Sequence, residues 1–209
     1  IDYMAARFGV KGIIFRDPLF TADRNRTIEI CRGMKGIEWA CETRLENVDE
    51  PLIDIMAKSG CKAVHFGIES ESDAVLALAN RSNPPFERQK HLIDRCDQQG
   101  IKVNCFFIFG LLGETEETAA ETINKAITLN PNVAEFFVAQ PYPGTSLYKQ
   151  VGERLYDLPL TAYDGFTQIF DHPNFRPGRL GKICTSAYRR FYFRPKYLRS
   201  FVRRNICRR

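Results

Sequence analysis

Charged and hydroxyl side chains stand just after several apolar runs of this chain, where they could bind a small charged ligand. Asp17 comes after the run GIIF, Glu42 and Arg44 close the run IEWACETR, and Glu69 and Ser70 follow the run AVHFGI. A carboxylate at such a position could accept hydrogen bonds from a ligand amine, and the planar fork of an arginine could hold a ligand carboxylate. The pattern favours an enzyme over a scaffold.

Each of these side chains also has a structural interpretation. Asp17 stands before a proline and could cap a turn. Glu42 and Arg44 are two residues apart on one expected strand, which places them on the same face, so they could form an internal ion pair. A glutamate that follows four apolar residues is costly to bury without a partner, which favours a ligand role for Glu69 over a surface one.

Two further segments offer backbone groups and an aromatic ring. In FFIFGLLGET (106–115), the glycines Gly110 and Gly113 would let the backbone approach a ligand closely, although a plain strand-to-helix turn explains them as well. In PYPGT (141–145), two prolines and a glycine predict a rigid turn, and Tyr142 offers a ring for stacking.

The cysteines and histidines show no pattern of metal ligands. No two of the seven cysteines lie within eight residues of each other, so the chain has no local CxxC motif. Their odd number and irregular spacing are typical of free thiols in a cytoplasmic protein. The three histidines are not paired at ligand spacing, which argues against a metal-dependent hydrolase. We therefore expect no metal site within this sequence. The residues are Cys31, Cys41, Cys61, Cys96, Cys105, Cys184, Cys207, His65, His91 and His172.

The elements that would position these residues alternate between strands and helices. We expect strands over 12–18, 37–43, 62–68, 102–109 and 133–139. We expect helices over 21–34, 49–60, 73–78, 86–99 and 115–130, with Thr21 or Asp23 and then Asp49 as N-caps. Each strand ends in a polar signature, as in a (β/α) barrel, whereas a Rossmann sheet would carry GxGxxG at its first turn. The predicted fold is α/β, a partial (β/α) TIM-like barrel of parallel strands with a small helical C-terminal extension.

The charge of the chain is concentrated at its C-terminal end. The net charge is +5, and residues 189–209 hold nine lysines and arginines and no acidic residue. We expect an incomplete core domain over 1–150, which begins inside a helix, and an irregular extension over 151–209 with helices from about Thr185. The basic tail could be a solvated helix packed by its aromatic face, or it could contact an anionic membrane surface. No nucleic-acid motif is present, and no apolar run is long enough to span a membrane.

The signatures taken together resemble the radical S-adenosylmethionine (SAM) superfamily. FRDPLFT (15–21) resembles the second strand of that family, and GIESESDAVL (67–76) resembles the fourth. FFIFGLLGET resembles the adenine-contacting fifth strand, and QPYPGTSLY (140–148) resembles a sixth-strand turn common in one branch. AYRRFYFRPKYL (187–198) resembles the C-terminal extension of the cobalamin-binding branch, whose members include enzymes that make hopanoids and modified tetrapyrroles.

The chain departs from the family pattern in two respects. The cluster loop CxxxCxxC is absent, and the expected helix at the start is the one that would follow that loop, which is typical of a C-terminal fragment. In the fifth-strand motif, Leu112 stands where the branch usually has proline, and Glu114 is displaced by one position.

The resemblance implies the C-terminal part of an enzyme that cleaves SAM at a 4Fe–4S cluster and abstracts hydrogen from an unactivated carbon, for methyl transfer or rearrangement. The cluster ligands, and a cobalamin if one is used, would lie upstream, and this chain alone would be inactive. The implied substrate is a small molecule of a kind that includes lipid-like compounds. A catalytically inactive (β/α) binding module is the alternative. By the resemblance, Asp17 would contact the SAM amine, Arg44 its carboxylate, and Glu69 and Ser70 the amine or ribose. The backbone at Phe109–Gly110 would contact adenine, with Glu42 and Tyr142 also in the site.

Overall fold

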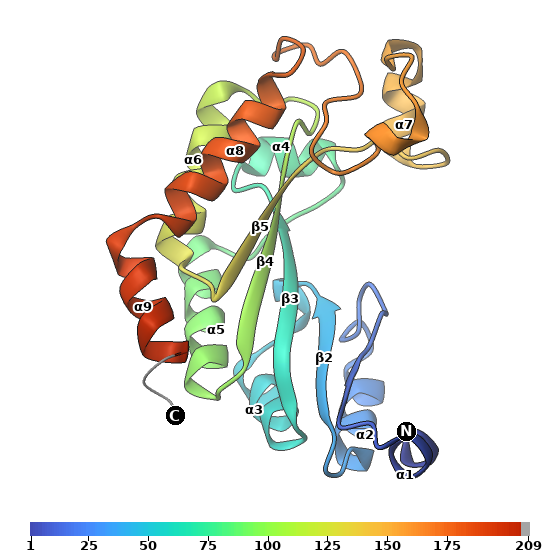
Figure 1. Ribbon diagram of the computed structural model, residues 1–209, viewed down its shortest axis with the longest axis vertical. Coiled ribbons are helices and arrows are strands. Elements are labelled where there is room, and N and C mark those ends of the chain that lie inside the picture. Colours follow the sequence, from blue (N-terminus) through green and yellow to red (C-terminus); the bar gives the residue numbers. More distant parts are fainter. Residues whose placement is uncertain (206–209) are drawn as a thin grey trace. The chain divides into compact units, whose positions relative to one another are not determined.

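The computed structural model describes residues 1–205 of the chain. It contains one five-stranded sheet in the order β1-β2-β3-β4-β5, with helices between successive strands (Figure 1). The pairs β1–β2 and β2–β3 are parallel. This strand order confirms the predicted α/β fold of a partial (β/α) barrel. The strands are Gly12–Ile14 (β1), Glu38–Thr43 (β2), Cys61–Glu69 (β3), Lys102–Phe109 (β4) and Val133–Val138 (β5).

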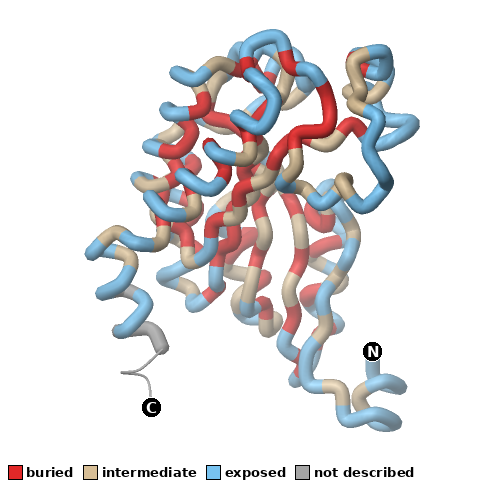
Figure 2. The backbone as a smooth tube through the Cα atoms, turned by 45° about the horizontal axis from the view of Figure 1, so that its top comes forward, coloured by how far each residue is buried: buried red, intermediate tan, exposed pale blue. Residues whose placement is uncertain are grey.

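The side chains of the strands alternate between buried and more exposed positions, and Figure 2 shows how buried residues collect on the strands and on one side of the helices. On β2, Trp39, Cys41 and Thr43 are buried, whereas Glu42 between them is only half-buried. Glu42 therefore lies on the face opposite to Trp39, as the alternation predicts.

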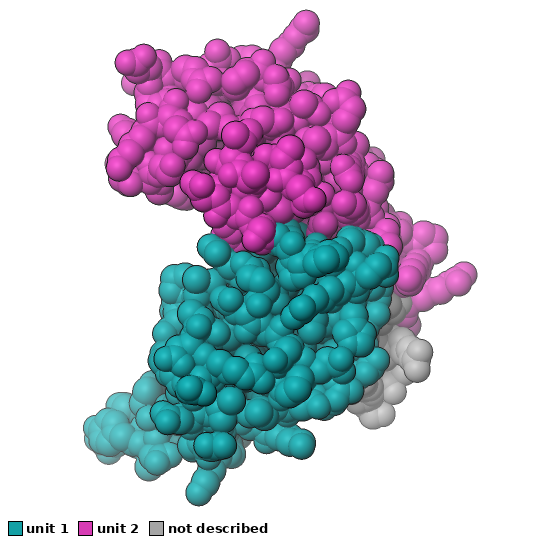
Figure 3. Space-filling model, turned by 180° about the vertical axis from the view of Figure 1, so that it is seen from behind, with its two compact units in different colours: residues 1–68, 83–105, 131–133 teal, residues 69–82, 106–130, 134–209 magenta. Residues whose placement is uncertain are grey.

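The chain divides into two compact units, coloured separately in Figure 3. Unit 1 consists of residues 1–68, 83–105 and 131–133, and unit 2 of residues 69–82, 106–130 and 134–209. The predicted boundary near residue 150 is a different division of the sequence and stays a prediction.

Unit 1 contains four α-helices and a short 3-10 helix. They are Asp2–Phe8 (α1), Arg24–Gly33 (α2), Glu50–Lys58 (α3), Phe86–Gln98 (α5) and the 3-10 helix Leu45–Asn47 (η1). The side chain of Asp23 caps α2 by accepting from the Arg26 N–H, and Asp49 caps α3 by accepting from the Leu52 N–H. Both caps were among the predicted ones, because a cap is a local hydrogen bond that neighbouring residue types specify.

The first strand is shorter than predicted. β1 ends at Ile14 rather than at residue 18, although the Phe15 N–H still donates to the Ala40 carbonyl at 2.9 Å. The chain then leaves the sheet before Pro18, whose nitrogen has no hydrogen to donate to a neighbouring strand.

As far as residue 205, unit 2 contains five α-helices and two 3-10 helices. They are Asp73–Leu78 (α4), Glu116–Leu129 (α6), Ser146–Val151 (α7), Arg179–Tyr192 (α8), Pro195–Asn205 (α9), Gly152–Arg154 (η2) and Leu160–Ala162 (η3). Helix α6 starts at a capping box between Thr115 and Thr118, and it packs against α8. Helix α8 begins six residues before the predicted start near Thr185, because the left-handed Gly178 precedes it and Leu180 already belongs to its buried stripe.

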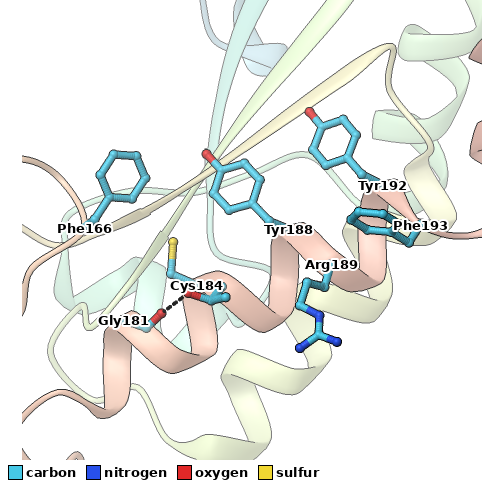
Figure 4. A pocket seen from close by; sticks show the side chains of 8 residues that line it. Phe166, Gly181, Cys184, Tyr188, Arg189, Tyr192 and Phe193 are labelled. Atoms are coloured by element: carbon cyan, nitrogen blue, oxygen red, sulfur yellow. Dashed lines mark hydrogen bonds between the residues drawn. The ribbon is translucent and has the colours of Figure 1, made fainter.

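Side chains of α8 bond to the backbone of β5, the last strand of the sheet, and Figure 4 shows them pointing from the helix toward that strand. The Tyr192 hydroxyl donates to the Ala134 carbonyl at 2.8 Å and accepts from the Ala134 N–H at 3.1 Å. The Tyr188 hydroxyl accepts from the Phe136 N–H at 3.2 Å, and the Cys184 thiol donates to the Phe136 carbonyl at 3.0 Å. These bonds cover an edge that could otherwise pair with another chain.

An apolar groove of about 460 Å³ runs beside these contacts, with the rings of Phe166, Tyr188, Tyr192 and Phe193 among its walls (Figure 4). No helix within residues 1–205 is long and apolar enough to cross a membrane.

Candidate functional site

The three site residues predicted in unit 1 each form an ion pair with a neighbouring residue. Asp17 accepts from Arg26 at 2.8 Å, and Glu42 lies 3.1 Å from Arg16. Arg44 lies 3.6 Å from Glu46. Glu42 and Arg44 therefore pair with Arg16 and Glu46, respectively, and not with each other.

The prediction that Glu42 and Arg44 share a strand is wrong. Strand β2 ends at Thr43, and Arg44 is the N-cap residue of η1, so the same-face rule for strands does not apply to it. Arg44 keeps about a third of its side chain exposed, and within residues 1–205 its guanidinium forms only this one long ion pair. It is therefore accessible to a ligand carboxylate.

The segment that carries Asp17 is tied to the end of β2. The hydroxyls of Thr21 and Thr43 are buried and lie 2.5 Å apart, and the Phe20 N–H donates to the Glu42 carbonyl at 3.0 Å. These buried bonds fix the backbone on both sides of the two carboxylates. Neither threonine was predicted as a site residue, because the two are 22 residues apart with no spacing signal between them.

In unit 2, Glu69 ends β3 in a conformation that glutamate rarely adopts. Its φ is 63°, in the left-handed region that a residue with a Cβ occupies only at a cost of about 1 kcal/mol or more. The Glu69 carboxylate lies 3.1 Å from the Arg81 guanidinium, and the Glu69 side chain is 14% exposed. Arg81 thus supplies the partner that a buried glutamate requires. The sequence did not indicate this role, because Arg81 lies after α4 in a polar segment that has no recognisable pattern.

The residues after Glu69 are anchored to helix α6. Ser70 is fully buried, and its Oγ lies 3.4 Å from the Thr122 hydroxyl and accepts from the Ser72 N–H at 3.2 Å. The Glu71 N–H donates to Thr122 at 3.1 Å, and the Lys125 ammonium donates to the Glu71 carbonyl at 3.1 Å. These contacts hold the turn after β3, and a ligand role for Ser70 stays a prediction.

The backbone at Phe109–Gly110 is also engaged within unit 2. The Phe109 carbonyl accepts from the Ala139 N–H at 2.8 Å, and the Gly110 N–H donates to a carboxylate oxygen of Glu114. Gly110 has φ 87°, and a Cβ there would lie 2.5 Å from the Leu180 Cδ1. The positive φ favours glycine at this position, and the close approach of Leu180 favours it further.

Glu114 is the buried acid that the sequence did not identify as functional. Its side chain is fully buried, and its second carboxylate oxygen, Oε1, has no hydrogen-bond partner in the described part of the chain. Burial raises the pKa of Glu114 to about 8, although the bond from the Gly110 N–H opposes this shift. At neutral pH the group is mainly the protonated acid, which could donate a hydrogen bond.

Residues of the C-terminal extension close over the same loop. The Asn174 side-chain amide donates to the Glu114 carbonyl at 2.8 Å, and the Asn174 N–H donates to the His172 Nδ1 at 3.1 Å. The His172 Nε2 must then carry the proton that it donates to the Leu111 carbonyl at 3.1 Å. Burial lowers the pKa of His172, which keeps the ring neutral.

The last predicted site residue, Tyr142, is half-exposed in unit 2. Its ring centroid lies 5.6 Å from that of Tyr163, and the two rings are tilted by 37°. The exposed part of the ring is available for stacking.

The cysteines do not form a cluster site in the described part of the chain. All six described cysteines are buried free thiols, and Cys207 lies outside the described residues. A hydrogen bond with Cys41 and burial raise the pKa of Cys61, and burial raises the pKa of Cys96 to about 12 and that of Cys184 to about 11. No three potential metal-ligating side chains come together within residues 1–205. These buried and separated cysteines do not fit a 4Fe–4S cluster, whose ligands are convergent thiolates.

Comparison with known proteins identifies relatives over almost the whole chain. A methyltransferase of Pyrococcus horikoshii, itself uncharacterized, is 30% identical over 197 residues, which are 91% of this chain and 43% of the relative. The anaerobic magnesium-protoporphyrin IX monomethyl ester cyclase of Rubrivivax gelatinosus is 28% identical over 204 residues, 95% of this chain and 37% of the relative. The chain spans less than half the length of these curated relatives.

Solved structures show the same fold. The radical SAM methyltransferase TsrM from Kitasatospora setae, solved with cobalamin and a [4Fe-4S] cluster, aligns with a TM-score of 0.68 at 18% identity and covers 93% of this chain and 45% of TsrM. At this identity the likeness concerns the fold alone. The model of the radical SAM superfamily matches residues 1–126, more than half of the chain, so the predicted resemblance is confirmed and the chain belongs to the radical SAM superfamily.

Proposed function

We propose that this chain is the SAM-binding part of an enzyme that carries out radical chemistry, methyl transfer or rearrangement, on an unactivated carbon. The family membership supports SAM as the ligand, since SAM supplies the adenosyl radical in this family. The observation that carries the proposal is the conformation of Glu69, because strained residues in sparsely populated backbone regions cluster at ligand sites.

The residue types at the strand ends fit the chemistry of SAM. Its methionyl part has an ammonium and a carboxylate. The carboxylates of Asp17, Glu42 and Glu69 suit the ammonium, and the guanidinium of Arg44 suits the carboxylate. All four are half-buried or partly exposed and could change partners when a ligand binds.

The cluster and a cobalamin would be supplied by further parts of a longer protein. The relatives are more than twice as long as the matched region, and TsrM was solved with both groups. We propose the same arrangement here, with a small-molecule substrate of the class that includes lipid-like compounds.

The alternative is a (β/α) module that binds a ligand without catalysis. The wide spacing of the cysteines in the sequence and the burial of the six described ones favour it for the 209-residue chain taken alone. The presence of a CxxxCxxC loop in a longer protein that contains this chain would favour the enzyme over the binding module.

The proposal is tested by SAM affinity, measured by calorimetry on the longest protein that contains this chain. We expect Glu69→Gln and Arg44→Ala each to weaken SAM binding about tenfold or more, because a charged hydrogen bond contributes roughly 1.5–3 kcal/mol. Glu38→Gln is the matched control, since Glu38 forms an exposed pair with Lys62 and should leave the affinity unchanged. Unchanged affinity in both site variants would contradict the assignment. Loss of thermal stability without loss of affinity would make the Glu69–Arg81 pair purely structural.

A further inference from the structure

The C-terminal part of unit 2 has an unusual charge distribution. Residues 172–209 contain twelve lysines and arginines and no aspartate or glutamate. Some of these cations are used within the unit: Arg179 pairs with Glu116 at 2.7 Å, Arg190 donates to the Asn124 side chain at 2.6 Å, and Arg194 donates to the Ile127 carbonyl.

Two cations of helix α9 are not used in contacts of this type. Lys196 and Arg199 are exposed, and neither side chain forms a hydrogen bond or an ion pair within the part of the chain that the structure describes. Their charges remain available to a partner outside the unit.

The same helix exposes an apolar face. Leu198, Phe201 and Val202 are spaced as neighbours on one side of a helix, and they are 49%, 51% and 46% exposed. We call these three residues the α9 apolar face. Arg199 borders this face in the helical projection, whereas Lys196 lies on the opposite side.

The ring of Tyr197 packs helix α9 against helix α8. Tyr197 contacts Phe191 and Tyr192, with centroids 5.3 Å and 4.9 Å apart. This contact packs α9 against the C-terminal end of α8, from which α9 continues in Figure 1, and none of the α9 side chains that are described is buried. Tyr197 also stacks on Phe201, with ring centroids 6.4 Å apart, and about half of each side chain of the α9 apolar face stays exposed.

We propose that α9 binds an anionic lipid surface, with the α9 apolar face inserted at the boundary between headgroups and acyl chains. A short amphipathic helix of low overall hydrophobicity, with lysine and arginine on its polar side and phenylalanine and leucine on the other, is the type that lies in such an interface. The absence of any acidic residue from 172–209 gives the charge complementarity that anionic headgroups require. A nucleic acid would use the cations but would leave Leu198 and Val202 without a role.

The test is flotation of the 209-residue protein with vesicles of phosphatidylcholine alone or with about a third phosphatidylglycerol, at low and high salt. We expect binding only to the anionic vesicles and its loss at high salt, since each cation near such a surface changes affinity by roughly fivefold. Two variants should each reduce binding at least tenfold: Lys196→Glu with Arg199→Glu, and Leu198→Ser with Phe201→Ser and Val202→Ser.

Each variant has a matched control. Lys11→Glu with Lys102→Glu makes the same change in net charge at exposed positions of unit 1. Tyr3→Ser with Met4→Ser and Phe8→Ser removes three apolar side chains that α1 exposes at 72%, 46% and 68%. Both controls should float like the parent, and circular dichroism checks that all four variants are folded.

Three results would overturn the proposal. The first is no flotation of the folded parent with anionic vesicles at low salt. The second is equal loss of flotation in a variant and its control. The third is binding of a single-stranded RNA, or self-association seen by light scattering, that depends on α9 in a protein that does not float. The last result would assign α9 to a nucleic acid or a protein interface.

Discussion

Glu114 is completely buried, and within residues 1–205 its carboxyl group has only one hydrogen-bond donor, the Gly110 N–H. A buried carboxylate without a countercharge is costly, so the folded protein favours the protonated acid. The acid holds the loop that follows β4, where the backbone meets Leu180 closely. We therefore regard Glu114 as a positioning residue for this loop.

The raised pKa of Glu114 predicts a specific dependence of stability on pH. The folded-state pKa is about 8, and the ordinary value is 4.5. Between these values the folded state keeps a proton that the unfolded state has lost, so the stability supplied by the neutral acid is complete below pH 4.5 and falls as pH rises toward 8. Glu114→Gln cannot ionise. The stability of the parent relative to this variant should fall by roughly 1.4 kcal/mol per pH unit within the window.

Urea unfolding of both proteins at several pH values between 5 and 8 measures this difference. The comparison cancels the opposite contribution of His172, whose pKa is lowered. Glu116→Gln is the control, because Glu116 is half-exposed and its pKa is lowered by Arg179. Parallel stability curves for the parent and Glu114→Gln would show that Glu114 is ionised in the folded protein.

Residues whose roles depend on near neighbours in the sequence could be predicted, and those that depend on distant partners could not. Asp23 and Asp49 cap helices through bonds to residues three positions on. The buried contact of Ser70 with Thr122 joins residues 52 apart, and Asn174 reaches Glu114 across 60. Nothing in the spacing of these residues predicts which pairs the tertiary structure brings together.

At the scale of elements, α8 replaces a sixth strand at the edge of the sheet. It pairs β5 through side chains one helical turn apart, whereas a strand would pair it through backbone groups. Burial raises the pKa of Tyr192 to about 12, so its hydroxyl stays protonated and can both donate and accept. The hydrogen bonding of the β5 edge thus depends on the hydroxyls of Tyr188 and Tyr192 and on the thiol of Cys184.

Removal of one hydroxyl should therefore destabilise unit 2. We expect Tyr192→Phe to lower the free energy of unfolding by about 1–3 kcal/mol, because it leaves the Ala134 N–H and carbonyl without their partner. It should also increase self-association through the uncovered edge. Tyr3→Phe, at an exposed tyrosine of α1, should change neither quantity. Equal melting temperatures for the two variants, measured by circular dichroism, would refute the role of α8.

The core elements could be predicted because each strand is mainly apolar and each intervening helix has a cap or a periodic stripe. It did not predict α7 or the true start of α8. Residues 150–181 lack a period, and the signal for α8 is a left-handed Gly178 that only the structure reveals. The short β1 and the place of Arg44 outside β2 were missed for a related reason, since strand ends depend on where backbone pairing stops.

At the scale of the whole molecule, the family could be predicted because its signatures are short and local, and the model of the radical SAM superfamily confirms it. The cofactors could not be predicted in this way, because the residues that bind a cofactor come together in space from separate positions of the sequence. The seven cysteines are spread along the chain, and the six described ones are buried in the core as free cysteines. Their burial serves packing, as is common for free cysteine.

We therefore expect the 209-residue chain, reconstituted anaerobically with iron and sulfide, not to hold a 4Fe–4S cluster. Ligation requires several convergent thiolates, and burial of thiols with raised pKa values opposes both their ionisation and their exposure to iron. Iron and sulfide analysis with visible absorption measures the outcome, and a longer protein that adds a CxxxCxxC loop to this chain is the positive control. About four irons per chain, with a cluster absorption band that disappears when single cysteines are replaced by alanine, would refute the prediction. That result would mean that the core cysteines rearrange around iron, and it would make this chain a cluster-binding unit in its own right.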